Sequence, residues 1–335
     1  MRFPFPLLVA DVGGTNVRLG LIRAPGATRI DLEPQRTEAH ASLQDAVLAA
    51  MQGQPRFPRS MLVCAAGPVE GRCVKLTNAS WTIDGTALAG ALGLDQGLLF
   101  NDFEAQAFSI PSLRPEWLLP IGPAKAGDHG TRLIHGPGTG LGTSALVRAG
   151  GRWLAIASEA SHSDFAPVAE DEWAFWPHIE RPHGRITPEA LITGPGLRRL
   201  HRARAAGRGA IPLELETPEI IAKALGDRHS DEANTIRVFW RLAARFAGDM
   251  ALAFVATGGV VLAGGMLPRI VDFLDPVAFR AAFENKAPYV ALARRIPVSI
   301  LMEKDTVLDG MAAIATHPEA YAIEYADRAW GSVTT

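Results

Sequence analysis

Residues 7–22 read LLVADVGGTNVRLGLI, in which two apolar runs, 7–10 and 17–22, flank a turn with adjacent glycines. Two such runs joined by a tight glycine turn predict the two strands of a β-hairpin. Glycines lack a Cβ, so backbone N–H groups of this turn could approach a phosphate closely, while Thr15 adds a hydroxyl and Asp11 could hold hydrated Mg²⁺. Paired glycines also serve a plain hairpin turn. The stretch alone leaves both interpretations open.

The rest of the chain alternates predicted strands and helices, which favours an α/β fold. Strands are predicted at residues 61–66, 98–100, 260–263 and 298–301, and helices at 42–51, 84–92, 231–257, 306–315 and from Leu267 onward. A second strand, glycine turn and strand at residues 133–147 repeats the layout of the first hairpin. This repetition suggests a duplicated fold in which each half offers one turn to a shared cleft. Residues 325–330 form either a short docked helix or a frayed end.

Composition narrows the functional classes. The chain has 335 residues, 48% hydrophobic and 20% charged, with a net charge of -2. We expect a soluble protein of two domains, with no membrane span and without the basic patch of a nucleic-acid binder. The first six residues do not resemble a signal peptide, and two cysteines, Cys64 and Cys73, form no disulfide framework or metal motif, so we expect a cytoplasmic protein. The five arginines of residues 198–208 indicate either a solvated helix and loop or an anion-steering surface.

A second glycine-rich turn runs from Gly138 to Gly142. Its spacing is neither that of a P-loop nor that of a dinucleotide-binding turn, so neither mechanism is implied. The turn could form an anion-binding nest of backbone N–H groups, or it could be a flexible loop.

An asparagine and an aspartate follow the predicted strand at residues 98–100. Asp102 should therefore lie at the carboxyl edge of the sheet, where ligands bind in α/β folds, and a carboxylate there could accept a proton from a hydroxyl group. The alternative is an N-cap for a helix beginning at Phe103, since Asn and Asp both cap helices well.

Glu159 and His162 stand in a polar stretch with Asp164 nearby. No third or fourth ligand stands at a helpful spacing for a metal. Mixed donors and acceptors suit a polyol, because each buried sugar hydroxyl needs partners of both kinds. A solvated surface loop is the alternative.

Taken in order, these segments resemble the bacterial glucokinase family, the ATP-dependent hexose kinases of the actin, Hsp70 and hexokinase superfamily. The resemblance covers nearly the whole chain. The matching segments are residues 11–16, 76–78 with Trp81, 101–103, 138–142, Glu159 with 162–167, Glu189 with 193–197, and 263–265.

The resemblance implies a role for each matched residue in phosphorylating glucose at its 6-hydroxyl with ATP and Mg²⁺. Asp102 would be the general base, and Asp11 would help to hold Mg²⁺, through water. The remaining sugar hydroxyls would be bound by Asn101, Glu159, His162 and Glu189. The nucleotide would be bound by Asp11, Val12, Gly13, Gly14, Thr15, Gly138 and Thr139, with Gly264 and Gly265 beside the adenosine.

The same resemblance implies a duplicated ribonuclease H-like fold with nucleotide and sugar in a cleft between its domains. The smaller domain would comprise residues 1–112 plus 303–324, the larger one 113–302, and closure would exclude water. The family usually has glycines around this glutamate and before the histidine, whereas this chain has serine and alanine there, which leaves the hexose range open. Alternatives are a kinase for another hexose or amino sugar and a non-catalytic sugar-sensing protein; a homodimer is left open.

Overall fold

The computed structural model describes residues 2–77, 79–123 and 130–331. The chain forms two compact units. Unit 1 comprises Met1–Arg114, Leu146–Ile156 and Asp305–Thr335, and unit 2 comprises Pro115–Ala145 and Ala157–Lys304. The domain boundaries expected from the resemblance stay a prediction.

Unit 1 is built on a mixed sheet with the strand order β16-β9-β5-β1-β2-β3, in which β4 also pairs with β2. The predicted hairpin is confirmed, because β1 and β2 pair antiparallel with Leu7 opposite Ile22 and Asp11 opposite Arg18. Strands β1, β5 and β9 run parallel. The strands are β1 (Leu7–Val12), β2 (Asn16–Ile22), β3 (Ile30–Asp31), β4 (Gln35–Arg36), β5 (Ser60–Ala65), β9 (Gln96–Asn101) and β16 (Trp330–Gly331). A small sheet consists of β6 (Val69–Glu70), β7 (Cys73–Lys75) and β8 (Thr82–Asp84).

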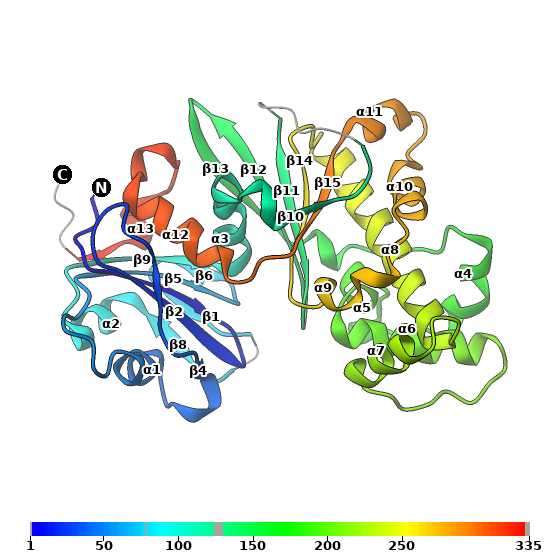
Figure 1. Cartoon of the computed structure of the whole chain (residues 1–335), viewed down its shortest axis with the longest axis horizontal. Coiled ribbons are helices and arrows are strands. Elements are labelled where there is room, and N and C mark those ends of the chain that lie inside the picture. The colour runs from blue at the N-terminus through cyan, green and yellow to red at the C-terminus, as the bar shows by residue number, and fades with distance from the viewer. Residues whose placement is uncertain (1, 78, 124–129, 332–335) are drawn as a thin grey trace. The chain divides into compact units, whose positions relative to one another are not determined.

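Helices cover both faces of this sheet, α3 (Asp102–Ser109) and α12 (Thr306–Thr316) on one side and α1 (Leu43–Ala50) and α2 (Gly85–Leu92) on the other (Figure 1). Successive side chains of a strand point to opposite faces, so β1 is buried on both. The helices predicted at residues 42–51 and 84–92 are confirmed and have standard caps: Ser42 accepts a hydrogen bond from Asp45 N, and Gly93 ends α2 with a left-handed φ of 65°.

The C-terminal segment is docked rather than frayed. After α13 (Tyr325–Arg328), strand β16 pairs antiparallel with β9, and Trp330 is 1% exposed. Its indole lies against Gly85 and Gly97, where any added Cβ would overlap the ring. The Arg328 guanidinium also lies 2.6 Å from the Glu104 carboxylate. The docked alternative is therefore confirmed for residues 325–331.

A second sheet has the order β10-β15-β14-β11-β12-β13, in which β11, β14 and β15 run parallel. Its strands are β10 (Leu118–Pro120), β11 (Arg132–Pro137), β12 (Leu141–Ala149), β13 (Arg152–Ser158), β14 (Gly259–Leu262) and β15 (Val298–Leu301). Unit 2 contains all of this sheet except residues 146–156 of β12 and β13, which belong to unit 1. Its helices are α4 (Glu170–Phe175), α5 (Pro188–Leu191), α6 (Gly194–Gly207), α7 (Thr217–Gly226), α8 (Asp231–Ala253), α9 (Leu267–Ile270), α10 (Pro276–Glu284) and α11 (Val290–Arg295).

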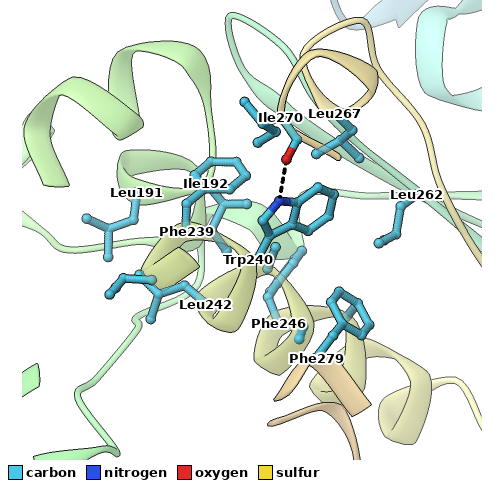
Figure 2. Close-up of a cluster of buried hydrophobic side chains, with 14 of the residues drawn as sticks. Leu191, Ile192, Phe239, Trp240, Leu242, Phe246, Leu262, Leu267, Ile270 and Phe279 are labelled. Carbon is cyan, nitrogen blue, oxygen red and sulfur yellow. Dashed lines mark hydrogen bonds between the residues drawn. The ribbon is translucent and has the colours of Figure 1, made fainter. Parts of the chain in front are cut away.

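The core of unit 2 is organised around α8. Figure 2 shows Trp240 of this helix among leucine, isoleucine and phenylalanine side chains, with its indole N–H donating to the Ile270 carbonyl over 3.0 Å. The predicted helix to Thr257 is wrong in its last turn. The helix ends at Ala253 because Val255 adopts a left-handed φ of 47° and Ala256 N–H bonds back to the Ala251 carbonyl, as in a Schellman motif.

The arginines of residues 198–208 lie on α6 and on Arg208, the residue after it, and each has a polar partner. Paired arginines support the prediction of a solvated helix, and nothing supports the alternative of an anion-steering surface. The partners are Glu216 for Arg198, Glu180 for Arg199, Glu214 for Arg202, Thr235 for Arg204 and Asp231 for Arg208. In the described part of the chain, no helix has the length and apolar character needed to cross a membrane.

Candidate functional site

The sheet of unit 1 brings two predicted acids to the same edge. Strand β1 pairs with β5 and β5 with β9, all parallel, so their carboxyl ends lie side by side. Asp11 is near the end of β1, Cys64 is its register partner on β5, and Asp102 directly follows β9. The predicted edge position of Asp102 is therefore confirmed.

Both carboxylate oxygens of Asp11 have protein partners. Oδ1 accepts a hydrogen bond from the Cys64 thiol over 3.5 Å, and Oδ2 lies 3.3 Å from Nη1 of Arg18. Burial raises the pKa of Asp11, and the Arg18 charge opposes that rise. Burial also raises the pKa of Cys64 well above its usual value, so the thiol remains a donor. This donor set fits Mg²⁺ held through water better than direct coordination, because Mg²⁺ keeps several of its waters in proteins.

Asp102 is a poised carboxyl group. Burial raises its pKa to about 6; the Phe103 N–H lowers it, and the Asp11 charge raises it further. Asp102 is not the cap of α3. That role belongs to Asn101, whose Oδ1 accepts from Phe103 N and Glu104 N over 2.9 and 3.2 Å while its Nδ2 donates to the Gly67 carbonyl. The capping alternative therefore describes Asn101 and leaves the Asp102 carboxylate for chemistry.

The first glycine turn is held by bonds within itself and to a distant threonine. Gly13 N–H donates to the Asn16 carbonyl over 2.9 Å, and Thr37 binds the carbonyls of Gly13 and Thr15 with its hydroxyl and its N–H. Since the amide of Gly13 is used inside the turn, an anion here would be bound by Gly14 and Thr15. Sequence reasoning missed Thr37, because nothing local marks a contact that spans 24 residues.

The second glycine turn is also fixed, which argues against a flexible loop. Gly138 N–H donates to the Gly140 carbonyl, and Gly194 N–H donates to the Gly138 carbonyl over 2.9 Å. Leu141 N–H donates to Oε2 of Glu189 over 3.0 Å. An added Cβ at Gly140 would lie only 2.9 Å from the same oxygen. Glu189 therefore joins the turn to the segment that carries the predicted sugar ligands.

Three of the predicted sugar ligands come together in unit 2. Nε2 of His162 lies 3.7 Å from Oε2 of both Glu159 and Glu189. His162 and Glu189 line a pocket of about 210 Å³ that also includes Thr139 of the second turn. The other lining residues, which sequence reasoning did not assign, are Pro182, His183, Arg185, Thr187, Ala190, Thr193, Pro195 and Arg199.

A buried ion pair holds the loop that follows His162. Nη1 of Arg245 lies 2.7 Å from Oε2 of Glu172, which is 1% exposed, and Nη2 of Arg245 donates to the Ala166 carbonyl. The guanidinium also stacks 4.1 Å from the centre of the Phe165 ring. Breaking such a pair would leave a buried charge unpaired, so the loop has one strongly preferred arrangement.

The serine and alanine residues before His162 fit the backbone. Residues 160–162 form a 3₁₀ turn in which His162 N–H donates to the Glu159 carbonyl, and neither Ala160 nor Ser161 has a positive φ. Glycine is therefore not required there on conformational grounds, and Ser161 is buried.

The last glycine pair follows β14 in unit 2. Gly264 has a φ of 101°, and a Cβ there would overlap the Pro137 carbonyl, so only glycine fits beside the end of β11. This places the predicted adenosine turn, Gly264 and Gly265, next to the strand that leads into Gly138.

Two points remain, on a matching segment and on possible metal ligands. Asn78, within the matching segment 76–78, lies outside the described residues. Among the residues that are described, no group of three or more His, Cys, Asp or Glu side chains could hold a metal ion.

We predict that Asp102→Asn stabilises the chain at pH 8 but not at pH 4. The folded-state pKa of Asp102 is about 6, above its unfolded value, so stability falls as pH rises between them. At pH 8 the buried charge costs about 2–3 kcal/mol, which the amide removes. Thermal unfolding at both pH values measures this. Asp84→Asn is the control, since N–H groups of Ala87 and Thr86 lower the pKa of Asp84 and its substitution should bring no gain at pH 8. An equal gain for Asp102→Asn at both pH values would contradict the prediction.

Comparison with known proteins identifies the family. A family model described as glucokinase matches residues 8–318. A glucokinase of Sinorhizobium medicae is 36% identical over 329 residues, covering 98% of this chain and 97% of that protein. The crystal structure of a glucokinase from an Antarctic psychrotroph superimposes with a TM-score of 0.82 at 28% identity, covering 94% of this chain and all of that one. The fold is also that of a ROK family glucokinase from Streptomyces griseus in complex with glucose and AMPPNP, with a TM-score of 0.60, 18% identity, and coverage of 92% and 98%. The chain therefore belongs to the glucokinase family.

Proposed function

We propose that this chain transfers the terminal phosphoryl group of ATP to the 6-hydroxyl of glucose, giving glucose 6-phosphate and ADP. The observation that carries the proposal is Asp102, a half-buried carboxyl group with a pKa of about 6 that lies with Asp11 at the edge of the sheet. Relatives matched over nearly the whole chain are named glucokinase.

Asp102 acts as the general base. At neutral pH it is mostly ionised, yet it is more basic than an ordinary aspartate, which suits it to accept a hydroxyl proton. Phosphoryl transfer involves little covalent chemistry by the protein, so positioning and charge neutralisation dominate the rate. Asn101 supports the base by capping α3 and fixing the backbone on which Asp102 stands.

The sugar hydroxyls are bound by Glu159, His162 and Glu189, together with Asn101. The carboxylates accept hydrogen bonds from hydroxyls, and His162 can donate or accept, so the set meets both needs of a polyol. Glu189 also accepts from Leu141 N–H, so sugar binding and the second glycine turn share one side chain.

ATP and Mg²⁺ are the cofactors of the proposed reaction. Gly14 and Thr15 bind phosphate groups from unit 1, Gly138 and Thr139 do so from unit 2, and Gly264 and Gly265 lie beside the adenosine. Asp11 holds Mg²⁺ through water, and the ion neutralises phosphate charge when bound. Val12 is buried in the core and keeps the turn in place, with its carbonyl accepting from Ala66 N–H.

The finer architecture is also a proposal. We propose a duplicated fold with domains at residues 1–112 plus 303–324 and 113–302, both acting on the same substrates. It is supported by two matching strand orders, β3-β2-β1-β5-β9 and β13-β12-β11-β14-β15, each with a glycine turn between its first two strands in the chain.

Two free cysteines and the use of ATP favour the cytoplasm as the location. A kinase for another hexose or amino sugar is the second candidate, since serine and alanine replace the expected glycines before His162.

The reaction is tested by coupled ADP release with Mg-ATP and a panel of hexoses. We expect release with glucose, and we expect Asp102→Ala to lower kcat by about 10²–10⁴-fold while glucose binding remains measurable. Release only with another sugar would favour the second candidate. Saturable glucose binding without ADP release would indicate a sensing protein, and near-normal turnover by Asp102→Ala would refute the assignment of the base.

The sugar set is tested by Glu189→Gln. The amide keeps one accepting oxygen but replaces the other with an N–H donor and removes the negative charge beside His162. It therefore cannot accept from both a sugar hydroxyl and Leu141 N–H as the carboxylate does, so we expect KM for glucose to rise roughly tenfold or more. Glu214→Gln is the matched control, because Glu214 pairs with Arg202 on the surface of the same unit. An unchanged KM in Glu189→Gln would remove Glu189 from the sugar set.

A further inference from the structure

Asp305 has an unusual conformation and an unused capping position. It begins the last segment of unit 1 and precedes α12, with a left-handed φ of 59°. Such a conformation is uncommon for a residue with a Cβ, and it persists only where the surroundings enforce it. Aspartate is among the best helix N-caps, yet the side chain of Asp305 makes no capping hydrogen bond to α12.

The Asp305 carboxylate turns instead toward the acid of the first glycine turn. Its Oδ1 lies 3.2 Å from Nε of Arg18, and Nη1 of the same guanidinium lies 3.3 Å from Oδ2 of Asp11. The backbone of Asp305 is also held, since its carbonyl accepts from Nη1 of Arg29 over 3.1 Å. Asp305, Arg18 and Asp11 thus form a series of charges within unit 1.

Arg18 alone could not fix Asp11. Its side chain is 49% exposed, and a single exposed ion pair on a long flexible side chain contributes little. A carboxylate on Nε restricts the rotation of the planar guanidinium and leaves Nη1 directed at Asp11. Asp305 therefore limits the rotation of Arg18, the partner of Oδ2 of Asp11, while the Cys64 thiol holds Oδ1.

We propose that Asp305 is a positioning residue for the phosphoryl transfer, acting through Arg18 to orient Asp11 toward the hydrated Mg²⁺ of the nucleotide. This inference rests on the proposed function. It predicts that the charge of Asp305 matters for Mg-nucleotide binding and not for glucose binding, because its side chain pairs with Arg18 next to Asp11, the residue proposed to hold Mg²⁺.

The test is Asp305→Asn, which removes the charge but keeps a residue that tolerates both a left-handed φ and an N-cap position. The matched control is Asp95→Asn, since Asp95 pairs with Arg59 over 2.6 Å in the same unit, away from the Asp305–Arg18–Asp11 series. Titration calorimetry with Mg-ADP should show binding weakened by about 10–100-fold in Asp305→Asn and little changed in the control. KM for Mg-ATP should rise in parallel, KM for glucose should stay constant, and Asp305→Glu should restore part of the loss.

Binding of ADP in EDTA separates positioning from a structural effect. Without Mg²⁺, wild type, Asp305→Asn and Asp95→Asn should bind ADP alike. Equal weakening in EDTA, or equal Mg-ADP affinity of Asp305→Asn and wild type, overturns the inference. A wild type that binds Mg-ADP but does not phosphorylate glucose refutes the proposed function alone, and a wild type that does not bind Mg-ADP refutes both.

Discussion

The removal of two neighbouring carboxylates, Asp11 and Asp102, from water is the constraint around which the candidate site of unit 1 is arranged. Three parallel strands place both acids at one sheet edge, where burial disfavours their charged forms. Arg18 and the Cys64 thiol offset the cost at Asp11, and the Phe103 N–H offsets part of it at Asp102. The compensation at Asp102 is incomplete, so its pKa stays near 6. A base with that pKa is suited to accept a proton from a hydroxyl group at neutral pH.

In unit 2, the second glycine turn and the loop after His162 are held by hydrogen bonds and a buried ion pair. Glu189 is the shared element, because it binds the second glycine turn through Leu141 N–H and lies beside His162. The buried Glu172–Arg245 pair holds the loop after His162 from the other side. Groups fixed before the substrate binds need little reorganisation, which favours both affinity and rate.

Local patterns predicted much of this structure. The hairpin at residues 7–22, the helices predicted at 42–51 and 84–92, and the edge position of Asp102 follow from short-range sequence signals, and the structure has them. The end of α8 was missed because a valine, Val255, occupies the left-handed position where sequence reasoning expects glycine. Asn101 and Asp102 are adjacent and both residue types cap helices well, so the sequence does not decide which of them caps α3. The structure shows that Asn101 does.

The partners that fix the candidate site could not be predicted, apart from one. Arg18 is the register partner of Asp11 in the hairpin, so counting residues outward from the glycine turn could have paired them. Thr37 contacts the turn at the Gly13 carbonyl and Asp305 contacts Arg18 on β2, both from distant positions, and no local pattern marks such contacts. Tertiary packing, not the motif itself, decides which groups of the turn remain for a ligand.

The central claim is that Asp102, held near neutral pKa by burial, is the base that accepts the sugar proton. Its most direct test is kcat/KM for glucose as a function of pH, with Mg²⁺ in excess over ATP so that titration of the nucleotide is suppressed. Our account predicts that kcat/KM rises with pH as one group ionises with an apparent pKa near 6. A value of kcat/KM that stays constant from about pH 5 to pH 8 would contradict it, since no ionisation of Asp102 would then limit the reaction.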